Sequence, residues 1–121
     1  MTNSSEPVAP CCAVDVDHFQ SRVIDASWQR PMLVDFWADW CAPCHALAPH
    51  LERVVTDCAG RIGLAKVEVD EGENMKLAGR YQLRGFPTVI LFVDGEERGR
   101  FSGARSRHQI NDWLRAHLPE T

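Results

Sequence analysis

The chain has 121 residues, 45% of them hydrophobic, which is enough for one compact domain and too few for two ordinary ones. Thirteen basic and 17 acidic residues give a net charge of -4, and no basic run could follow a phosphate backbone, so we expect no nucleic-acid partner. No apolar run approaches the length of a membrane span and the N-terminus lacks a secretory pattern, so we expect a cytoplasmic protein without membrane contact.

The first half of the chain alternates between predicted strands and helices. Residues 1–12 are polar and aperiodic, so they are expected to form a flexible tail before a single domain at 13–121. The short strand "AVDV" leads to a helix capped by Asp17, and the apolar run "PMLVDFWAD" predicts a strand that is covered on both faces. A helix is then expected from Pro43 to Gly60.

The second half continues this alternation. "IGLAKVEVD" predicts another buried strand, "GENMKLAGRYQL" a short helix, and "TVILFV" with "EERGRFSG" a hairpin that turns at Asp94 and Gly95. Ser106 can cap a last helix. The order β-α-β-α-β-α-β-β-α favours an α/β fold with helices on both faces of a central sheet. Reactive residues belong at the carboxyl end of a central strand, and Cys41 lies at such a position.

The stretch "WCAPCH" contains Cys41, Cys44 and His45, and three chemistries use this spacing: thiol-disulfide exchange, zinc ligation and attachment of a c-type haem. Zinc usually takes four ligands, and a second Cys-x-x-Cys or His-x-x-x-His pair is missing. Haem needs an axial ligand opposite His45 and room for a macrocycle, whereas strands fill the middle of this chain. Only the short motif formed by Cys41, Cys44 and His45 supports a zinc site or a haem attachment site.

Thiol-disulfide exchange fits the wider context of the pair. Pro43 is favourable in the first helical turn, which puts Cys41 at the helix cap, where unpaired N–H groups and the helix dipole stabilise a thiolate. Cys44 follows one turn later, close enough for a disulfide with Cα atoms about 5 to 6 Å apart. Two packed cysteines without a role are the remaining alternative, but a strand-to-helix junction is a poor place to bury thiols.

These motifs resemble the thioredoxin family. "LVDFWADWCAPC" is similar to its strand and active-site signature, and "RGFPT" (Arg84–Thr88) resembles the loop that carries its cis-proline. "DG" at 94–95 and "SGA" at 102–104 resemble its hairpin turn and the glycine near its substrate groove. The resemblance covers about residues 13 to 119 and implies the thioredoxin fold, a central mixed sheet flanked by helices on both faces.

The resemblance also implies roles for single residues. Asp35 resembles the buried aspartate that assists deprotonation of Cys44, and burial should raise its pKa, although an outward-facing aspartate is equally consistent with the residues alone. Lys66 resembles the lysine beside that aspartate; alone it would be interpreted as a solvated strand residue. Pro87 resembles the cis-proline that exposes the backbone of Phe86 to an extended substrate, with a trans proline as the alternative.

The family pattern further implies a flat apolar rim around an exposed Cys41 sulfur, which binds extended chains weakly. The rim residues would be Trp40, Ala42, Pro43, Gly85, Phe86, Gly103 and Ala104. Two positions depart from the family: Ala42 stands where glycine is usual, and His45 where lysine or arginine is usual. A histidine titrates, so His45 can make the Cys41 thiolate and the reduction potential depend on pH.

Together these features predict a protein-disulfide oxidoreductase that reduces disulfides in client proteins. Cys41 would attack, and Cys44 would resolve the mixed disulfide with help from Asp35. We expect a monomer with no bound cofactor and no metal, recharged, by family resemblance, by an NADPH-dependent thioredoxin reductase. Two alternatives stay open: a disulfide oxidant or isomerase on the same fold, and a module that holds clients without turnover. Cys58 is expected to be a buried core thiol.

Overall fold

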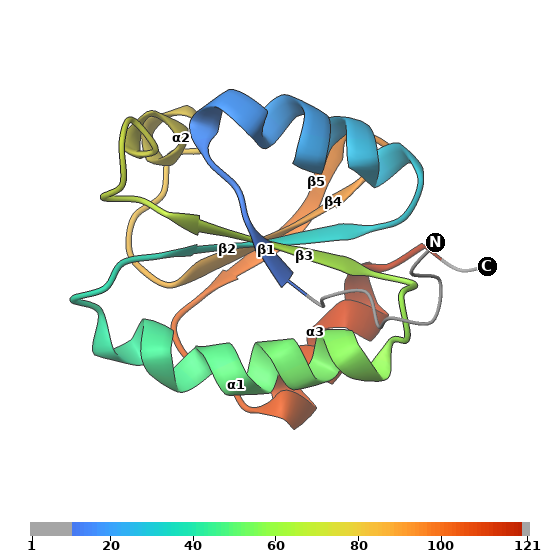
Figure 1. The fold of residues 1–121 in the computed structure, drawn as a ribbon. Helices are drawn as coiled ribbons and strands as arrows, with labels where there is room; N and C mark the ends of the chain where they lie inside the picture. The colour runs from blue at the N-terminus through green and yellow to red at the C-terminus, as the bar shows by residue number, and fades with distance from the viewer. Residues whose placement is uncertain (1–10, 120–121) are drawn as a thin grey trace, which may run out of the picture.

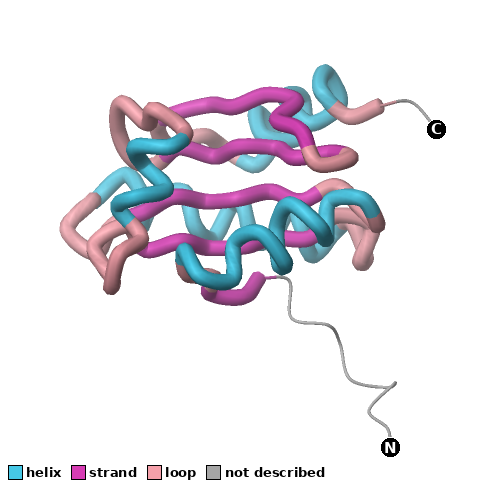
Figure 2. Tube along the Cα trace, turned by 90° about the horizontal axis from the view of Figure 1, so that it is seen from above, coloured by secondary structure: helices cyan, strands magenta, loops and turns pink. Residues whose placement is uncertain are grey.

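The computed structural model describes residues 11–119 of the chain. Figure 1 shows a central sheet with helices on both of its faces. The strands are β1 (Cys11–Ala13), β2 (Met32–Trp37), β3 (Gly63–Glu68), β4 (Thr88–Val93) and β5 (Glu96–Ser102). They lie in the order β1-β3-β2-β4-β5, so β2 is central and β1 and β5 form the edges, as the view from above in Figure 2 shows.

Helical segments connect most of these strands. η1 (Val16–His18), η2 (Gln20–Asp25) and η3 (Ala26–Trp28) follow β1 in succession, α1 (Ala42–Asp57) follows β2, α2 (Met75–Arg80) follows β3, and α3 (Arg107–His117) follows β5. In Figure 1, α1 and α3 cover one face of the sheet, and the η segments and α2 cover the other. Within residues 11–119, no helix is both long enough and apolar enough to cross a membrane.

The sheet is mixed. β3 pairs in parallel with both β1 and β2, whereas β4 pairs antiparallel with β2 and β5. In this register Asp35 on β2 lies between Lys66 on β3 and Val89 on β4. The predicted α/β architecture with a mixed central sheet is therefore confirmed. The carboxyl end of β2 leads into the loop that carries Cys41.

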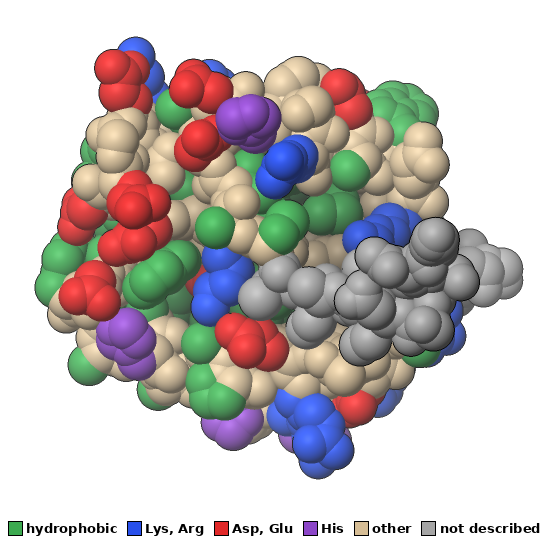
Figure 3. All heavy atoms as spheres, viewed as in Figure 1, with side chains coloured by type: hydrophobic (Ala, Val, Ile, Leu, Met, Phe, Trp, Pro, Cys, Tyr) green, Lys and Arg blue, Asp and Glu red, His purple; other side chains and the backbone are tan. Residues whose placement is uncertain are grey.

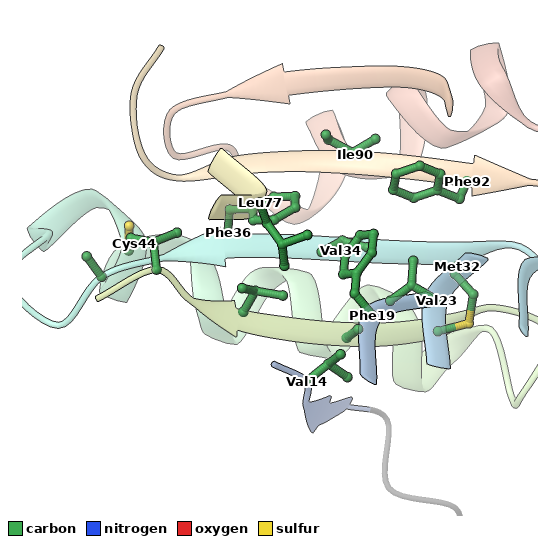
Figure 4. Close-up of a cluster of buried hydrophobic side chains, with 14 of the residues drawn as sticks. Val14, Phe19, Val23, Met32, Val34, Phe36, Cys44, Leu77, Ile90 and Phe92 are labelled. Carbon is green, nitrogen blue, oxygen red and sulfur yellow. The ribbon is translucent and has the colours of Figure 1, made fainter. Parts of the chain in front are cut away.

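Alternation along β2 divides the core between the two faces of the sheet. Val34 and Phe36 point towards the η segments and α2, where they pack with the fully buried Phe19, and Figure 4 shows this cluster. Leu33 points to the opposite face and joins the cluster beneath α1 and α3. Asp35 has the same parity as Leu33, so its carboxyl group lies on the α1 face of the sheet, next to a cluster of apolar side chains.

The first strand begins earlier than the sequence predicts. Cys11, Cys12 and Ala13 pair with β3 as a parallel edge strand, so the predicted tail boundary after residue 12 is wrong for the two cysteines. A short segment without a periodic side-chain pattern can still form an edge strand, because backbone hydrogen bonds to a neighbouring strand do not depend on that pattern. The rest of the predicted tail, 1–10, lies outside the described residues.

The first helical region also differs from its prediction. Asp15 rather than Asp17 is the cap, since the Asp15 carboxylate accepts a hydrogen bond from the backbone N–H of His18 at 3.0 Å. The region is three short segments in place of one regular helix. By contrast, Ser106 caps α3 as predicted, accepting from the backbone N–H of Gln109 at 3.2 Å.

Candidate active site

The two cysteines of the "WCAPCH" stretch are joined by a disulfide whose Cα atoms lie 5.3 Å apart. β2 ends at Trp37, and α1 begins at Ala42 with Pro43 in its first turn, which makes Cys41 the N-cap residue. The backbone N–H of Cys44 donates to the Cys41 sulfur at 3.2 Å. The Cys41 sulfur therefore sits where the positive end of the α1 dipole stabilises negative charge.

The predicted exposure of the Cys41 sulfur is wrong for this oxidised form. Cys41 exposes 3% of its surface and Cys44 exposes 2%. Besides bonding to each other, both cysteines belong to the buried hydrophobic cluster that contains Phe36, which accounts for their low exposure. The residues that flank Cys41 in the chain, Trp40 and Ala42, are exposed, so the pair lies just beneath the protein surface.

Asp35 is a buried acid next to this junction. It exposes 1% of its surface, and neither carboxylate oxygen has a hydrogen-bond partner among the described residues. Burial raises the pKa of Asp35 to about 6; the positive charge of Lys66 opposes this rise, and the negative charge of Glu52 adds to it. The alternative of an outward-facing aspartate is wrong, and the raised pKa is as predicted.

Lys66 is the neighbour of Asp35 in the sheet, but its charge is directed elsewhere. The two residues are register partners on β3 and β2. The Lys66 ammonium nitrogen lies 3.1 Å from Oε2 of Glu52 on α1 and 5.4 Å from the centre of the Trp37 ring. With 19% of its side chain exposed, Lys66 is not a freely solvated strand residue. Its ion-pair partner is Glu52, which the sequence analysis does not single out.

The loop before β4 contains the predicted cis-proline. The Phe86–Pro87 peptide bond is cis, so the trans alternative is wrong, and Pro87 is buried. The Pro87 carbonyl accepts a hydrogen bond from the Gly103 N–H at 2.9 Å, and the Thr88 hydroxyl donates to the Gly85 carbonyl at 2.6 Å. The first of these bonds holds the "RGFPT" loop beside the "SGA" segment, and the second lies within the loop.

The predicted rim residues come from three separate segments. The rings of Trp40 and Phe86 meet edge to face with their centres 6.2 Å apart. Trp40 is 68% exposed, and its indole N–H donates to the Asp70 carboxylate at 2.6 Å. Ala42, Pro43 and Ala104 are also exposed, whereas Gly85, Phe86 and Gly103 are half-buried. The rim is thus an open surface with one large, fixed aromatic ring.

Acidic side chains gather at the end of the sheet where β2 leads into α1, which is on the left of the face drawn in Figure 3. Asp15, Asp17, Glu71 and Glu73 line a shallow pocket between η1 and the start of α2. Together with Asp70, which bonds Trp40, they give this part of the surface a negative charge. The pattern agrees with the net charge of -4.

His45, the second departure from the family pattern, lies exposed on α1. Its Nε2 is 2.8 Å from the carbonyl oxygen of Asp39, and since a carbonyl only accepts, the Nε2 atom carries the proton. Its ring packs edge-on against Trp37, with centres 5.9 Å apart. His45 is therefore held against the loop that leads into the cysteine pair.

The haem and zinc alternatives gain no support from this geometry. Cys41 and Cys44 are bonded to each other, whereas haem attachment would require both sulfurs. Among residues 11–119, no three His, Cys, Asp or Glu side chains are grouped in a way that could hold a metal ion.

Comparison with known proteins agrees with this geometry. The family model described as Thioredoxin matches residues 10–116. The chain belongs to the thioredoxin family. Thioredoxins from Acidithiobacillus ferridurans and Pseudomonas aeruginosa are 39% and 38% identical to it over 105 and 104 residues, covering 87% and 80% of this chain and 94% of each relative. Thioredoxin C-2 from Corynebacterium nephridii is 42% identical over 94 residues, covering 78% of this chain and 83% of the relative.

Membership of the thioredoxin family, combined with the Cys41–Cys44 disulfide, makes the chain a dithiol-disulfide oxidoreductase. The thioredoxin fold and this activity are both as predicted. The other cysteines differ from the predictions in detail. Cys58, expected in the core, is half-buried at the end of α1, and burial raises the pKa of its thiol. Cys12 is an exposed free thiol on the edge strand.

Two charged residues at this thioredoxin site, Glu52 and Asp70, escape the sequence analysis. Glu52 is 14 positions from Lys66 in sequence, and Asp70 is 30 positions from Trp40. The one available signal is that Glu52 directly follows Leu51 on the apolar face of its helix, where a charge must lie at the border of the core. The packing of α1 on the sheet, rather than any local pattern, makes Lys66 the partner of Glu52.

Proposed function

We propose that this protein reduces disulfides in client proteins, with Cys41 as the nucleophile and Cys44 as the resolving thiol. The observation that carries the proposal is the position of the Cys41 sulfur at the N-cap of α1, where it accepts the Cys44 N–H. A helix N-terminus lowers the pKa of a thiol placed there, so the reduced form would hold Cys41 as a thiolate near neutral pH.

The reaction then runs through two exchanges. The Cys41 thiolate attacks one sulfur of the client disulfide, which forms a mixed disulfide and releases the other client sulfur as a thiolate that takes up a proton. Cys44 loses its proton and attacks the Cys41 sulfur, which forms the Cys41–Cys44 disulfide and releases the second client thiolate. Two electrons pass from the cysteine pair to the client. The Cys41–Cys44 disulfide in the structure corresponds to the product of these two exchanges.

Asp35 is proposed to take the proton of Cys44 in the second exchange. A base works best when its pKa lies near the working pH, and burial raises the pKa of Asp35 to about 6, from 3.8 for an ordinary aspartate. Its carboxylate oxygens are also free of other hydrogen bonds among the described residues. Asp35 is therefore available for a proton in the pH range where thiol exchange operates.

Client binding is proposed to use the rim. The exposed Trp40 ring and the half-buried Phe86 offer an apolar surface beside the pair, and the backbone before Pro87 would pair with an extended client segment. Ala42, Pro43, Gly85, Gly103 and Ala104 would complete this surface. The neighbouring acidic side chains favour client segments that are neutral or basic.

The oxidised pair requires a two-electron reductant for the next turnover, and we propose an NADPH-dependent thioredoxin reductase, on the strength of membership of the thioredoxin family. We also propose that the protein works as a monomer without a bound cofactor, since one chain supplies both cysteines and Asp35. A cytoplasmic location is supported by the free thiols of Cys12 and Cys58, which such a compartment keeps reduced.

Insulin reduction driven by NADPH and thioredoxin reductase tests the proposal. The wild type should precipitate insulin, Cys41→Ser should be inactive, and Cys44→Ser should accumulate mixed disulfides that mass spectrometry detects. Cys58→Ser is the matched control and should keep full turnover, because Cys58 lies at the other end of α1. A wild type that oxidises reduced ribonuclease but cannot reduce insulin would instead identify an oxidant.

A further inference from the structure

Glu52 forms an ion pair that is unlike the others in the described residues. The other six salt bridges join residues three or four positions apart on one segment, whereas Glu52 and Lys66 join α1 to β3. Their side chains are 39% and 19% exposed, so the pair is partly buried between the helix and the sheet. The ion pair between α1 and β3 can therefore fix where the Lys66 ammonium lies relative to β2, the strand next to β3 in the sheet.

Few charges face the Asp35 carboxyl group. β3 contributes Lys66, α1 contributes Glu52, and β4 contributes the uncharged register partner Val89. The side of α3 that packs on this face is apolar. The charges that act on Asp35 are therefore one ammonium and one carboxylate, and these two groups are bonded to each other.

Two carboxylates, those of Asp35 and Glu52, are neighbours of the Lys66 ammonium, which forms its ion pair with Glu52. Asp35, its register partner, keeps no hydrogen-bond donor among the described residues. We propose that Glu52 is a positioning residue for the exchange reaction: it holds the Lys66 ammonium on α1 and so sets the pH range in which Asp35 accepts the proton of Cys44. The link to exchange rests on the proposed function, whereas the effect of Glu52 on Lys66 and Asp35 does not depend on it.

Loss of the Glu52 charge should make Asp35 easier to ionise, for two reasons that act in the same direction. Removing the charge of Glu52 removes a negative charge that disfavours ionisation of Asp35, and it also leaves Asp35 as the nearest carboxylate for the ammonium of Lys66. Both changes stabilise the Asp35 carboxylate. Asp35 would then ionise at lower pH and become a weaker base for Cys44.

The first experiment titrates Asp35 directly in the oxidised protein, by 13C NMR of the labelled aspartate carboxyl groups, with Asp35→Asn to assign the signal. Glu52→Gln should move the Asp35 midpoint to lower pH by about 0.5 to 1 unit. Asp57→Asn is the matched control, since it removes an acid from the same helix at an exposed pair with Arg53, and should leave the midpoint in place. An unmoved midpoint in Glu52→Gln would overturn the proposal.

A double-mutant cycle separates positioning from simple charge repulsion. Lys66→Met should raise the Asp35 midpoint, and in that background Glu52→Gln should produce a smaller shift, because no ammonium remains to be released. Equal shifts in the two backgrounds would show that Glu52 acts only through its own charge, and the positioning role would be wrong. Thermal unfolding of each variant identifies any that fails to fold, and the Lys66→Met arm tests the network from its other end.

The final measurement links the network to exchange. The rate at which mixed disulfides are resolved should rise with pH to a plateau, and Glu52→Gln should move the midpoint of that rise to lower pH while Asp57→Asn does not. If the wild type fails to reduce insulin while Glu52→Gln still shifts the NMR midpoint, the proposed function is wrong and the positioning role stands. If insulin is reduced but neither midpoint moves, the positioning role alone is wrong.

Discussion

Lys66 and Asp35 are register partners on adjacent parallel strands, yet the Lys66 ammonium pairs with Glu52 on α1 and leaves the Asp35 carboxylate without a partner. A buried carboxylate without a hydrogen-bond donor costs stability whenever it is ionised. The ionised Asp35 side chain therefore lowers the stability of the fold, and its oxygens are not occupied by other hydrogen bonds among the described residues.

The first prediction concerns the stability cost of Asp35. Its pKa rises from 3.8 to about 6 in the folded protein, so folding favours the protonated form, and this contribution is present below pH 4 and lost as pH rises through 6. The loss amounts to about 3 kcal/mol in the free energy of unfolding. Asp35→Asn should remove it, so urea unfolding of variant and wild type should differ increasingly from pH 4 to pH 7. A constant difference across that range would show that Asp35 is not perturbed.

The second prediction concerns thiol reactivity in the reduced protein. Cys41, at the N-cap of α1, should react with iodoacetamide at pH 7 about tenfold faster than free glutathione does, because the helix end stabilises its thiolate. Cys58 provides the internal comparison, since burial raises the pKa of its thiol, and it should react more slowly than glutathione. Peptide mapping after timed labelling separates the two sites. Equal rates at both would contradict the assigned nucleophile.

The third prediction concerns client binding by Trp40. Trp40→Ala should raise KM for insulin about fivefold or more, while reduction of a small aromatic disulfide stays near the wild-type rate, because only a protein client needs the rim. Trp28→Ala is the control: Trp28 is 65% exposed, similar to Trp40, but lies on η3, which contacts the far end of the β4–β5 hairpin. Comparable losses in the two variants would indicate a general effect on solubility rather than a client surface.

The fourth prediction concerns the cap of α3. The Ser106 hydroxyl accepts from the Gln109 N–H, and the Gln109 side chain accepts from the Ser106 N–H at 3.0 Å. Ser106→Ala should lower the free energy of unfolding by about 1 kcal/mol without a change in insulin turnover. Ser106→Asp, which restores an acceptor at the helix N-terminus, should recover most of the loss. Denaturant unfolding measures both.

Several features of the site were predictable from sequence because their determinants are neighbours in the chain. Cys41 and Cys44 lie three positions apart, and a helical first turn brings any two such residues together whatever surrounds them. The apolar run of β2 predicts a strand that is covered on both faces, and Ser106 predicts a helix start, since each depends on local hydrogen bonding or on side-chain pattern alone.

Other features required contacts between distant segments. β1 forms at Cys11–Ala13 because β3 offers a free edge, and nothing in the residues of β1 itself indicates this pairing. The burial of Asp35 depends on α1 covering the sheet, and a strand containing an aspartate is equally consistent with the opposite orientation.

The chain alone thus determined the chemistry, the cysteine pair and the order of strands and helices, because these follow from spacing, local propensity and family motifs. The tertiary structure decided which charge faces which: the Lys66 ammonium could pair with Asp35 or with Glu52, and the packing of α1 against the sheet selected Glu52. Electrostatic interactions depend on distance and burial, and neither exists until the helix and the sheet are packed together.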